Sequence, residues 1–205
     1  MHLEIFVEEP SAEVAVKCLI PKILGSEVSF GVYTHQGKTA LLADLPSRLR
    51  AYARWLPEDW RILVLLDADS QDCRELKRQL DEIARAAGLR PRADVEGWTG
   101  LQVLNRLAIE ELEAWFFGDV EAVCAAYPGV PSTLGKRKAY RDPDAIRGGT
   151  WEALERELQR VGYHAGGLSK IKAAREISVH MEPERNRSVS FQAFRNGLLG
   201  LISGG

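Results

Sequence analysis

The sequence lacks any long apolar run, and this limits the class of protein it can encode. None of its apolar stretches approaches the roughly 20 residues that a membrane-spanning helix needs, although 45% of its 205 residues are hydrophobic. The first residues also lack the basic segment of a secretory signal peptide. We therefore expect a globular, cytoplasmic protein that buries a full core.

Paired cysteines and closely spaced histidines are also missing. The three cysteines, Cys18, Cys73 and Cys124, lie far apart, and none belongs to a Cys-x-x-Cys pair. This spacing supports neither a disulfide framework nor a zinc knuckle. The four histidines show no zinc-ligand spacing either.

A complete phosphate-binding loop is absent as well. The segment from Gly31 to Thr39 follows an expected strand and precedes an expected helix, as a Walker loop does. However, five residues separate Gly31 from Gly37, whereas the Walker pattern has four. ATP binding here is therefore disfavoured, and we expect Lys38 to approach the neighbouring acidic edge of the sheet instead.

The sequence does contain short apolar runs that alternate with longer amphipathic ones, a pattern typical of βαβ units and a parallel sheet. We expect strands at residues 3–7, 28–34, 61–66 and 101–109. Helices are expected at residues 10–25, 38–55 and 73–87, with Ser11 capping the first and Pro46 interrupting the second. The predicted fold is α/β, a Rossmann-like parallel sheet of about four strands flanked by helices.

The character of the chain changes near residue 128. Residues 1–127 fit the α/β core, and residues 128–205 read as a helical, basic extension packed on it, with helices near 151–161, 168–180 and 190–202. Residues 1–135 carry 14 Lys and Arg against 21 Asp and Glu, whereas residues 136–205 carry 13 against 8. An acidic part that holds cations and a basic part that holds phosphates would suit a nucleic-acid enzyme; two solvated surfaces with a chance asymmetry are the alternative.

Acidic side chains follow three of the expected strands. Glu8 follows the first strand, Asp67 and Asp69 follow the third, and either Glu110 or Glu113 supplies the acid after the fourth. Because the carboxyl ends of parallel strands meet at one edge, we expect these side chains to converge, with Asp67 and Asp69 on one side of an extended backbone. Several carboxylates in one place repel each other without a cation, and their oxygens suit Mg²⁺ or Mn²⁺. The sequence therefore predicts a metal site made by Glu8, Asp67 and Asp69.

Four further residues are expected around this metal site. Glu9 and Glu13 are candidates for contacts with its ligands or for ligands of a second metal, and Lys38 is expected to approach the site from the neighbouring strand. Asp72 is a candidate too, but for this residue we favour a role as the cap of the helix that follows. For Glu9 and Glu13 the alternative is a favourable acid near a helix N-terminus.

The acidic residues and the segments around them resemble known protein families. A strand that ends in Val7-Glu8 and a later strand that ends in Asp67-Ala68-Asp69 resemble the Toprim domain of topoisomerases, DnaG-type primases, recombination nucleases and OLD-family nucleases. More narrowly, several blocks resemble DUF4276, a bacterial Toprim-like family of unknown function, over most of the chain: residues 6–13, 36–38, 45–50, 67–73, 113–115 and 185–191.

The resemblance implies a Mg²⁺-dependent phosphoryl-transfer enzyme, and more narrowly a nuclease that acts on DNA or RNA. It also implies a role in a bacterial phage-defence system, together with an ATPase partner. It implies that Glu8 is the acid or base, that Asp67 and Asp69 are metal ligands, and that Glu113 is a further catalytic acidic residue. Glu9 stands where Toprim domains usually have glycine, which leaves open whether Glu8 or Glu9 is the key acid.

A nuclease also needs cations that hold the phosphate. The candidates are Lys170, Lys172, Arg185 and Arg187, with solvated helix faces as the alternative. No tyrosine lies in a context that singles it out as a topoisomerase nucleophile, so strand transfer is disfavoured. Two other functions stay open: a non-catalytic Toprim-like subunit that binds nucleic acid or regulates an ATPase partner, and a nucleotide-binding regulator.

Overall fold

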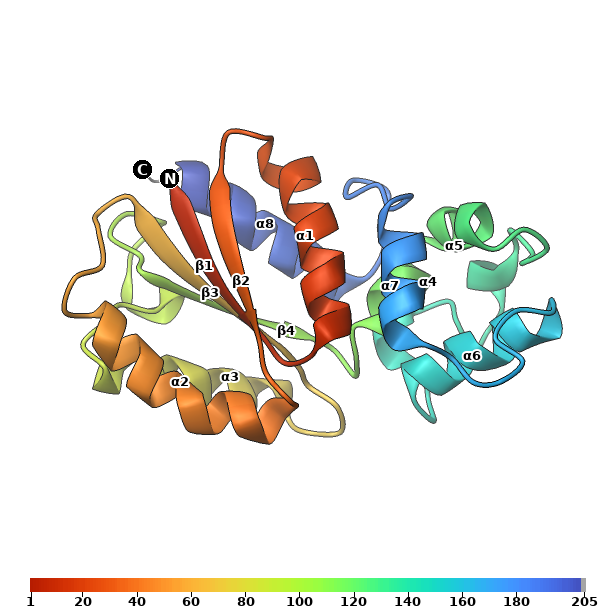
Figure 1. Cartoon of the computed structure of the whole chain (residues 1–205), viewed down its shortest axis with the longest axis horizontal. Coiled ribbons are helices and arrows are strands. Elements are labelled where there is room, and N and C mark those ends of the chain that lie inside the picture. Colours follow the sequence, from red (N-terminus) through yellow and green to blue (C-terminus); the bar gives the residue numbers. More distant parts are fainter. Residues whose placement is uncertain (204–205) are drawn as a thin grey trace.

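A four-stranded parallel sheet forms the centre of the computed structural model, which describes residues 1–203 (Figure 1). The strands lie in the order β2-β1-β3-β4, and every pairing between them is parallel. Their bounds are β1 His2–Val7, β2 Ser29–Thr34, β3 Trp60–Asp67 and β4 Val103–Ala108. This arrangement confirms the predicted α/β fold with about four parallel strands.

Successive residues of the central strand β3 pack against opposite faces of the sheet. Leu63 and Leu65 belong to one hydrophobic core, whereas Ile62, Val64 and Leu66 belong to the other. A strand that is buried on both faces reads as a continuous apolar run, and this is why residues 61–66 could be recognised as a strand.

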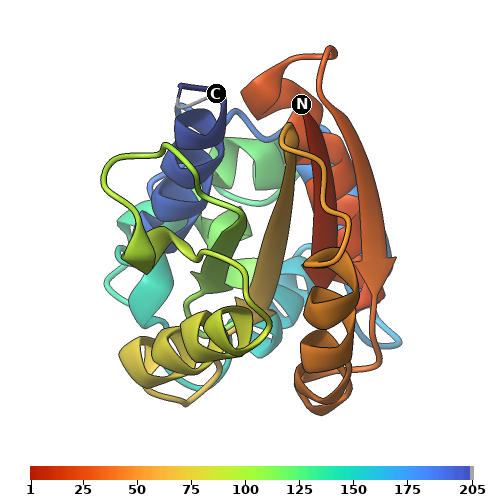
Figure 2. The same cartoon turned by 90° about the vertical axis from the view of Figure 1, so that its left-hand side faces the viewer.

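Helices cover both faces of the sheet (Figures 1 and 2). Helices α2 (Lys38–Tyr52) and α3 (Cys73–Ala86) cover one face, and α1 (Pro10–Leu24) and α8 (Val189–Ser203) cover the other. Helix α7 (Lys170–Ser178) packs alongside α1. None of the helices within residues 1–203 combines the length and apolar character that crossing a bilayer requires.

The remaining helices lie beyond the carboxyl end of β4 (Figure 1). They are α4 (Glu113–Gly118), α5 (Val120–Ala126) and α6 (Thr150–Arg160), together with short 3₁₀ turns at Leu134–Lys136 and Pro143–Ala145. A further 3₁₀ turn, Arg92–Asp94, lies before β4, near the amino end of that strand. The larger hydrophobic core is continuous from the sheet into these helices. The domain boundary that we expect between residues 127 and 128 stays a prediction. Helix α8, which belongs to the later part of the chain, packs back against the sheet.

Two local predictions differ from the structure. Pro46 does not interrupt its helix, because α2 continues through it from Lys38 to Tyr52. Ser11 does not cap α1: Pro10 takes the first helical position, which its fixed φ favours, so Glu9 precedes the helix and Ser11 lies buried inside it.

The predicted cap of α3 is confirmed. The Asp72 side chain accepts hydrogen bonds from the backbone N–H groups of Arg74 at 2.8 Å and Glu75 at 3.2 Å. These N–H groups have no partner within the helix, and the carboxylate satisfies both.

We expect Asp72→Ala to lower the free energy of unfolding by about 1 kcal/mol, because it removes this cap from a helix that covers the sheet. Urea denaturation of the two proteins measures the difference. Asp72→Ser keeps a capping oxygen and should stay close to the wild type; equal losses in both variants would contradict the capping role.

Candidate functional site

The carboxyl ends of β1 and β3 and the start of α4 bring acidic side chains together. Asp67 is the last residue of β3 and is 8% exposed, and Glu113 opens α4 and is 1% exposed. Glu8 follows β1, and its Oε2 accepts a hydrogen bond from the backbone N–H of Asp67 at 3.3 Å. With Glu9 and Glu111, these residues form what we call the carboxylate cluster. The predicted convergence of Glu8, Asp67 and Glu113 is therefore present in the structure.

Burial dominates the electrostatics of the cluster. It raises the pKa of Asp67 well above its usual range, and the nearby charges of Glu113, Glu8 and Glu9 raise that pKa further. Burial also raises the pKa of Glu113, to about 7, although Lys170 acts in the opposite direction. Within residues 1–203, neither carboxylate oxygen of Glu113 has a hydrogen-bond partner.

Lys170, the first residue of α7, supplies positive charge to the cluster. Its Nζ lies 3.6 Å from Glu111 Oε1, 3.8 Å from Glu9 Oε1 and 4.0 Å from Glu113 Oε2. Burial lowers the pKa of Lys170, but the carboxylates, Glu113 foremost, outweigh burial and raise it. The sequence predicted Lys170 as a phosphate contact, and the structure places it among the carboxylates.

Glu111 was not predicted from the sequence. Its Oε2 accepts hydrogen bonds from Thr150 N at 3.0 Å, Thr150 Oγ1 at 2.9 Å and Trp151 N at 3.0 Å. Glu111 therefore caps the N-terminus of α6 while its other oxygen faces Lys170. No local pattern could reveal this, because the capped helix starts in a distant part of the chain.

Asp69 does not join Asp67. The extended backbone on which that prediction depended ends with β3, and Asp69 has a φ of 49°, in the left-handed region. Its half-exposed carboxylate faces Lys38, with Oδ2 2.5 Å from Nζ, and its backbone N–H donates to Glu110 O at 2.7 Å. The predicted metal trio is therefore divided: Glu8 and Asp67 lie together, and Asp69 pairs with Lys38.

Glu8 lies at the N-terminus of α2. Its carboxylate accepts hydrogen bonds from the backbone of Asp67 and of Lys38, and these lower its pKa against the larger effect of burial, which raises it. Gly37, with a φ of 90°, precedes the helix, and its N–H donates to the backbone oxygen of Glu8 at 3.0 Å. A carboxylate thus occupies the helix N-terminus where a phosphate-binding loop would hold phosphate.

Two of the residues expected around the metal site lie outside the cluster. Glu13 pairs with Lys17 one turn along α1, and Asp72 caps α3. Glu9, in contrast, lies in the cluster close to Lys170 and accepts a hydrogen bond from Ser11 Oγ.

The donor chemistry of the cluster matches a hard cation. Buried carboxylate oxygens are the ligands that Mg²⁺ and Mn²⁺ take, and the two oxygens of Glu113 lack a hydrogen-bond partner among the described residues. However, in the observed conformation of residues 1–203, no three His, Cys, Asp or Glu side chains lie close enough together to hold a metal ion. A cation would therefore have to draw the carboxylates together.

The other predicted phosphate contacts are engaged elsewhere. Lys172 has a largely exposed side chain that lies 3.8 Å from Glu176, one turn further along α7. Arg187 donates from Nη2 to Gly135 O at 3.5 Å. Neither side chain approaches the carboxylate cluster.

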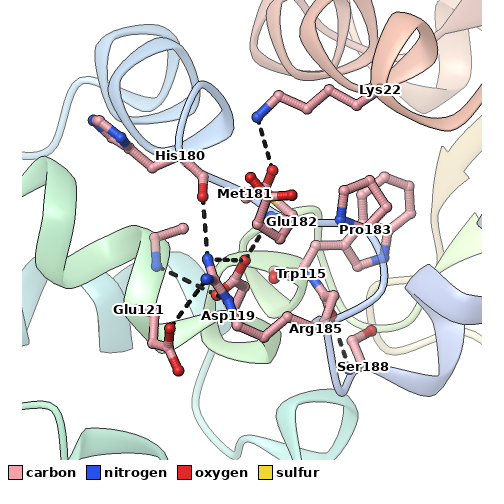
Figure 3. Close-up of polar contacts among 12 residues, drawn as sticks. Lys22, Trp115, Asp119, Glu121, His180, Met181, Glu182, Pro183, Arg185 and Ser188 are labelled. Carbon is pink, nitrogen blue, oxygen red and sulfur yellow. Dashed lines mark hydrogen bonds and ion pairs between the residues drawn. The ribbon is translucent and has the colours of Figure 1, made fainter. Parts of the chain in front are cut away.

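Arg185 forms a bidentate ion pair with the buried Asp119 (Figure 3). Nε donates to Oδ1 at 2.7 Å and Nη2 to Oδ2 at 3.0 Å, while Nη1 donates to Glu121 at 3.0 Å. Asp119 also accepts from the backbone N–H groups of Glu182 and Ala122. The guanidinium is thus committed to carboxylates, and we give Arg185 a structural role.

Comparison with known proteins gives a match to one family. A family model described as a domain of unknown function (DUF4276) matches residues 7–199. The matched range includes every member of the carboxylate cluster and Lys170. No curated protein and no solved structure matches the chain.

We expect Glu113→Gln to change how stability depends on pH. In the folded protein the pKa of Glu113 is raised from 4.5 to about 7. The contribution of the protonated side chain to the free energy of unfolding is therefore complete below pH 4.5 and is lost as the pH rises to about 7. The neutral glutamine avoids this loss. At pH 8 the free energy of unfolding of the variant should therefore exceed that of the wild type by about 3 kcal/mol.

Urea denaturation at pH 4.5 and pH 8 with a metal chelator measures this effect. Glu27→Gln, at an exposed position between α1 and β2, is the matched control. A Glu113→Gln effect of the same size at both pH values would contradict the raised pKa.

We expect Arg185→Gln to lower the free energy of unfolding by about 3 kcal/mol, because it leaves the Asp119 carboxylate buried without its cation. Arg187→Gln, which loses one bond to a carbonyl, should cost much less. Thermal unfolding of both variants measures the difference, and a fully stable Arg185→Gln protein would restore a ligand-binding role for this arginine.

Proposed function

The chain belongs to the DUF4276 family of unknown function, and we propose that it is a Mg²⁺-dependent phosphoryl-transfer enzyme, a nuclease acting on DNA or RNA. The carboxylate cluster carries this proposal. It buries Asp67 and Glu113 at the carboxyl edge of a parallel sheet, the edge where open α/β sheets bind their ligands. Buried acids with raised pKa values are typical of catalytic sites.

Asp67 and Glu8 are the residues that would hold the metal, with Glu113 beside them. When bound, Mg²⁺ or Mn²⁺ supplies positive charge at a phosphate oxygen and lowers the pKa of a water molecule. Glu113 has a pKa of about 7 and therefore exists in both protonation states near neutral pH. Among the described residues its oxygens have no hydrogen-bond partner. Glu113 can accept a proton from the attacking water.

Lys170 is the proposed phosphate contact. The carboxylates that surround its Nζ raise its pKa against the effect of burial, so the amine is charged at neutral pH. If Glu9 and Glu113 held a cation, the ammonium group of Lys170 would be free to donate to a phosphate oxygen. Asp69, which pairs with Lys38, would orient that lysine at the rim of the site.

The Toprim-like relationship, the phage-defence setting and the ATPase partner belong to this proposal. They follow from the resemblance of the blocks that include Glu8 and Asp67. The excess of basic residues in residues 136–205, 13 against 8 acidic ones, supports a nucleic-acid substrate, because phosphate contacts dominate such binding.

A second candidate function is a non-catalytic Toprim-like subunit that binds nucleic acid or regulates an ATPase. Lys170 already lies within 4.0 Å of three carboxylates, and Glu111 uses one oxygen to cap α6. A cluster balanced in this way can fix α7 to the edge of the sheet without a metal. Metal binding therefore separates the two functions.

We expect Mn²⁺ or Mg²⁺ to raise the melting temperature of the wild-type protein, because a ligand that binds only the folded state stabilises it. Nicking of a supercoiled plasmid should then require the metal, and Asp67→Asn should reduce it about 100-fold or more. The exposed substitution Asp59→Asn is the control and should leave both readings unchanged.

Lys170 and Lys172 offer a matched pair on one helix. Lys170→Met should slow cleavage strongly, whereas Lys172→Met, which removes an exposed ion pair, should not.

If the metal does not stabilise the protein and Asp67→Asn cleaves like the wild type, the enzyme proposal fails and the non-catalytic function replaces it. The melting and nicking assays are both run with and without any ATPase that a neighbouring gene encodes.

A further inference from the structure

A hollow lies along the open edge of β4, and no member of the carboxylate cluster lines it. It has a volume of about 470 Å³ and is lined by residues of α3, β4 and α8. We call it the edge pocket and define it by these residues: Arg74, Lys77, Asn105, Arg106, Leu107 and Val189. Its volume lies in the range of sites that bind small molecules.

Arg106 brings an unbalanced positive charge to the edge pocket. Its guanidinium donates to Ala193 O at 2.8 Å and Asn105 O at 2.9 Å. Burial lowers the pKa of Arg106 to about 10, so it is still charged at neutral pH. In residues 1–203 no carboxylate lies within ion-pair distance of it, and a partly buried cation without an anion is unfavourable. An anionic ligand would remove this cost.

Two more cations on α3 face the same pocket. Arg74 and Lys77 are three residues apart and therefore lie on one face of the helix. The side chain of Arg74 is exposed and has no bonded partner within the described part of the chain, while Lys77 Nζ lies 3.4 Å from Asp81. Three cations of the pocket can therefore approach one phosphate group.

Two carboxylates also line the edge pocket, and both already accept hydrogen bonds. Asp144 accepts from Ser188 Oγ at 2.8 Å and from the backbone N–H of Ser190 at 2.8 Å. Asp142 accepts from the backbone N–H of Asp144 at 3.1 Å. These bonds reduce the repulsion that an anionic ligand would meet.

Asn105 supplies an independent sign of a ligand. The residue is 0% exposed, and its Nδ2 donates to Asp81 Oδ1 at 2.7 Å. Its Oδ1 is buried and has no hydrogen-bond partner in the described residues. Leaving such an acceptor unpaired is unfavourable, and a ligand N–H group that displaced the side chains covering this oxygen would pair with it.

We propose that the edge pocket binds a nucleoside monophosphate unit. Arg106, Arg74 and Lys77 hold the phosphate, and the base lies against the apolar side chains of the pocket while one of its N–H groups donates to Asn105 Oδ1. The unit is either a free nucleotide or the terminal nucleotide of a strand. The pocket shares Cys73, Arg74 and Ile109 with a neighbouring hollow over the loop after β3.

Titration of the full-length chain with adenosine 5′-monophosphate in the presence of EDTA tests the proposal by calorimetry. Val189 is 74% exposed on the wall of the pocket, and we expect Val189→Glu to weaken binding about tenfold through charge repulsion. Val179→Glu is the matched control, because Val179 is also exposed, at 55%, and lies outside the pocket. It should leave binding unchanged.

A second pair of variants lies on α3. Lys77→Gln should weaken binding about tenfold, because it removes a charged hydrogen bond to the phosphate. Arg78→Gln, on the next residue, removes an exposed arginine that pairs with Glu75 and Glu82 and should have no effect.

Gly197→Ala tests Arg106 without removing its charge. A Cβ at Gly197 would lie within 2.5–2.8 Å of the Arg106 guanidinium, so the guanidinium must move, while alanine favours the helix. Nucleotide binding should weaken, and the melting temperature should not fall.

Four ligands separate the contributions and the source of the nucleotide. Purine riboside 5′-monophosphate, whose base has no N–H, and adenosine, which has no phosphate, should each bind about tenfold more weakly than adenosine 5′-monophosphate. An oligonucleotide with a 5′-phosphate that binds more tightly than the free nucleotide identifies a strand end, and the reverse order identifies a free nucleotide. Inorganic phosphate should bind much more weakly than either.

The proposal is overturned if neither the nucleotide nor the oligonucleotide binds, if inorganic phosphate binds as tightly as the nucleotide, or if Val179→Glu weakens binding as much as Val189→Glu. The outcome is independent of the proposed nuclease function, because the titration contains no metal. Asp67→Asn should retain full nucleotide affinity even if it abolishes cleavage.

Discussion

Negative charge buried at the carboxyl edge of β1 and β3 has to be balanced, and Lys170 supplies the balancing cation. Its ammonium group faces Glu9 before α1, Glu113 in α4 and Glu111, which caps α6. One side chain therefore ties α7 to three other helices. Burying an ion pair gives little net stability, but removing one partner leaves an uncompensated charge and is strongly destabilising. This contact thus adds to the hydrophobic core in holding α7 at the edge of the sheet.

The same constraint makes the carboxylate cluster responsive to cations. A pKa of about 7 for Glu113 means that the cluster gains or loses a proton near neutral pH, since burial opposes the charged form while Lys170 favours it. Ion-pair networks that serve only structure also shift pKa values. What sets this cluster apart is that both oxygens of Glu113 lack a hydrogen-bond partner within residues 1–203, whereas a structural network normally satisfies its buried oxygens.

The sequence predicted those features that depend on local signals or on the geometry of parallel strands. The apolar run of β3 and the cap at Asp72 are local, and the convergence of Glu8, Asp67 and Glu113 follows from the shared edge of the sheet. Other features depend on distant parts of the chain. The partner of Arg185 is Asp119, and no periodicity links the two residues. Even the wrong placement of Asp69 has a local cause, because its left-handed backbone follows directly after β3.

The loop between β3 and α3 connects the carboxylate cluster with the edge pocket. At one end Asp67 closes the strand inside the cluster, and at the other Asp72 fixes the first turn of α3, where Arg74 enters the pocket. Within the loop, Asp69 turns away toward Lys38. The short connection holds both ends in place, because the strand is buried on both faces and the helix start is capped. A nucleotide bound in the edge pocket would therefore lie at a fixed position relative to Asp67, and this is the geometry that a strand end needs if it is to be presented to the cluster.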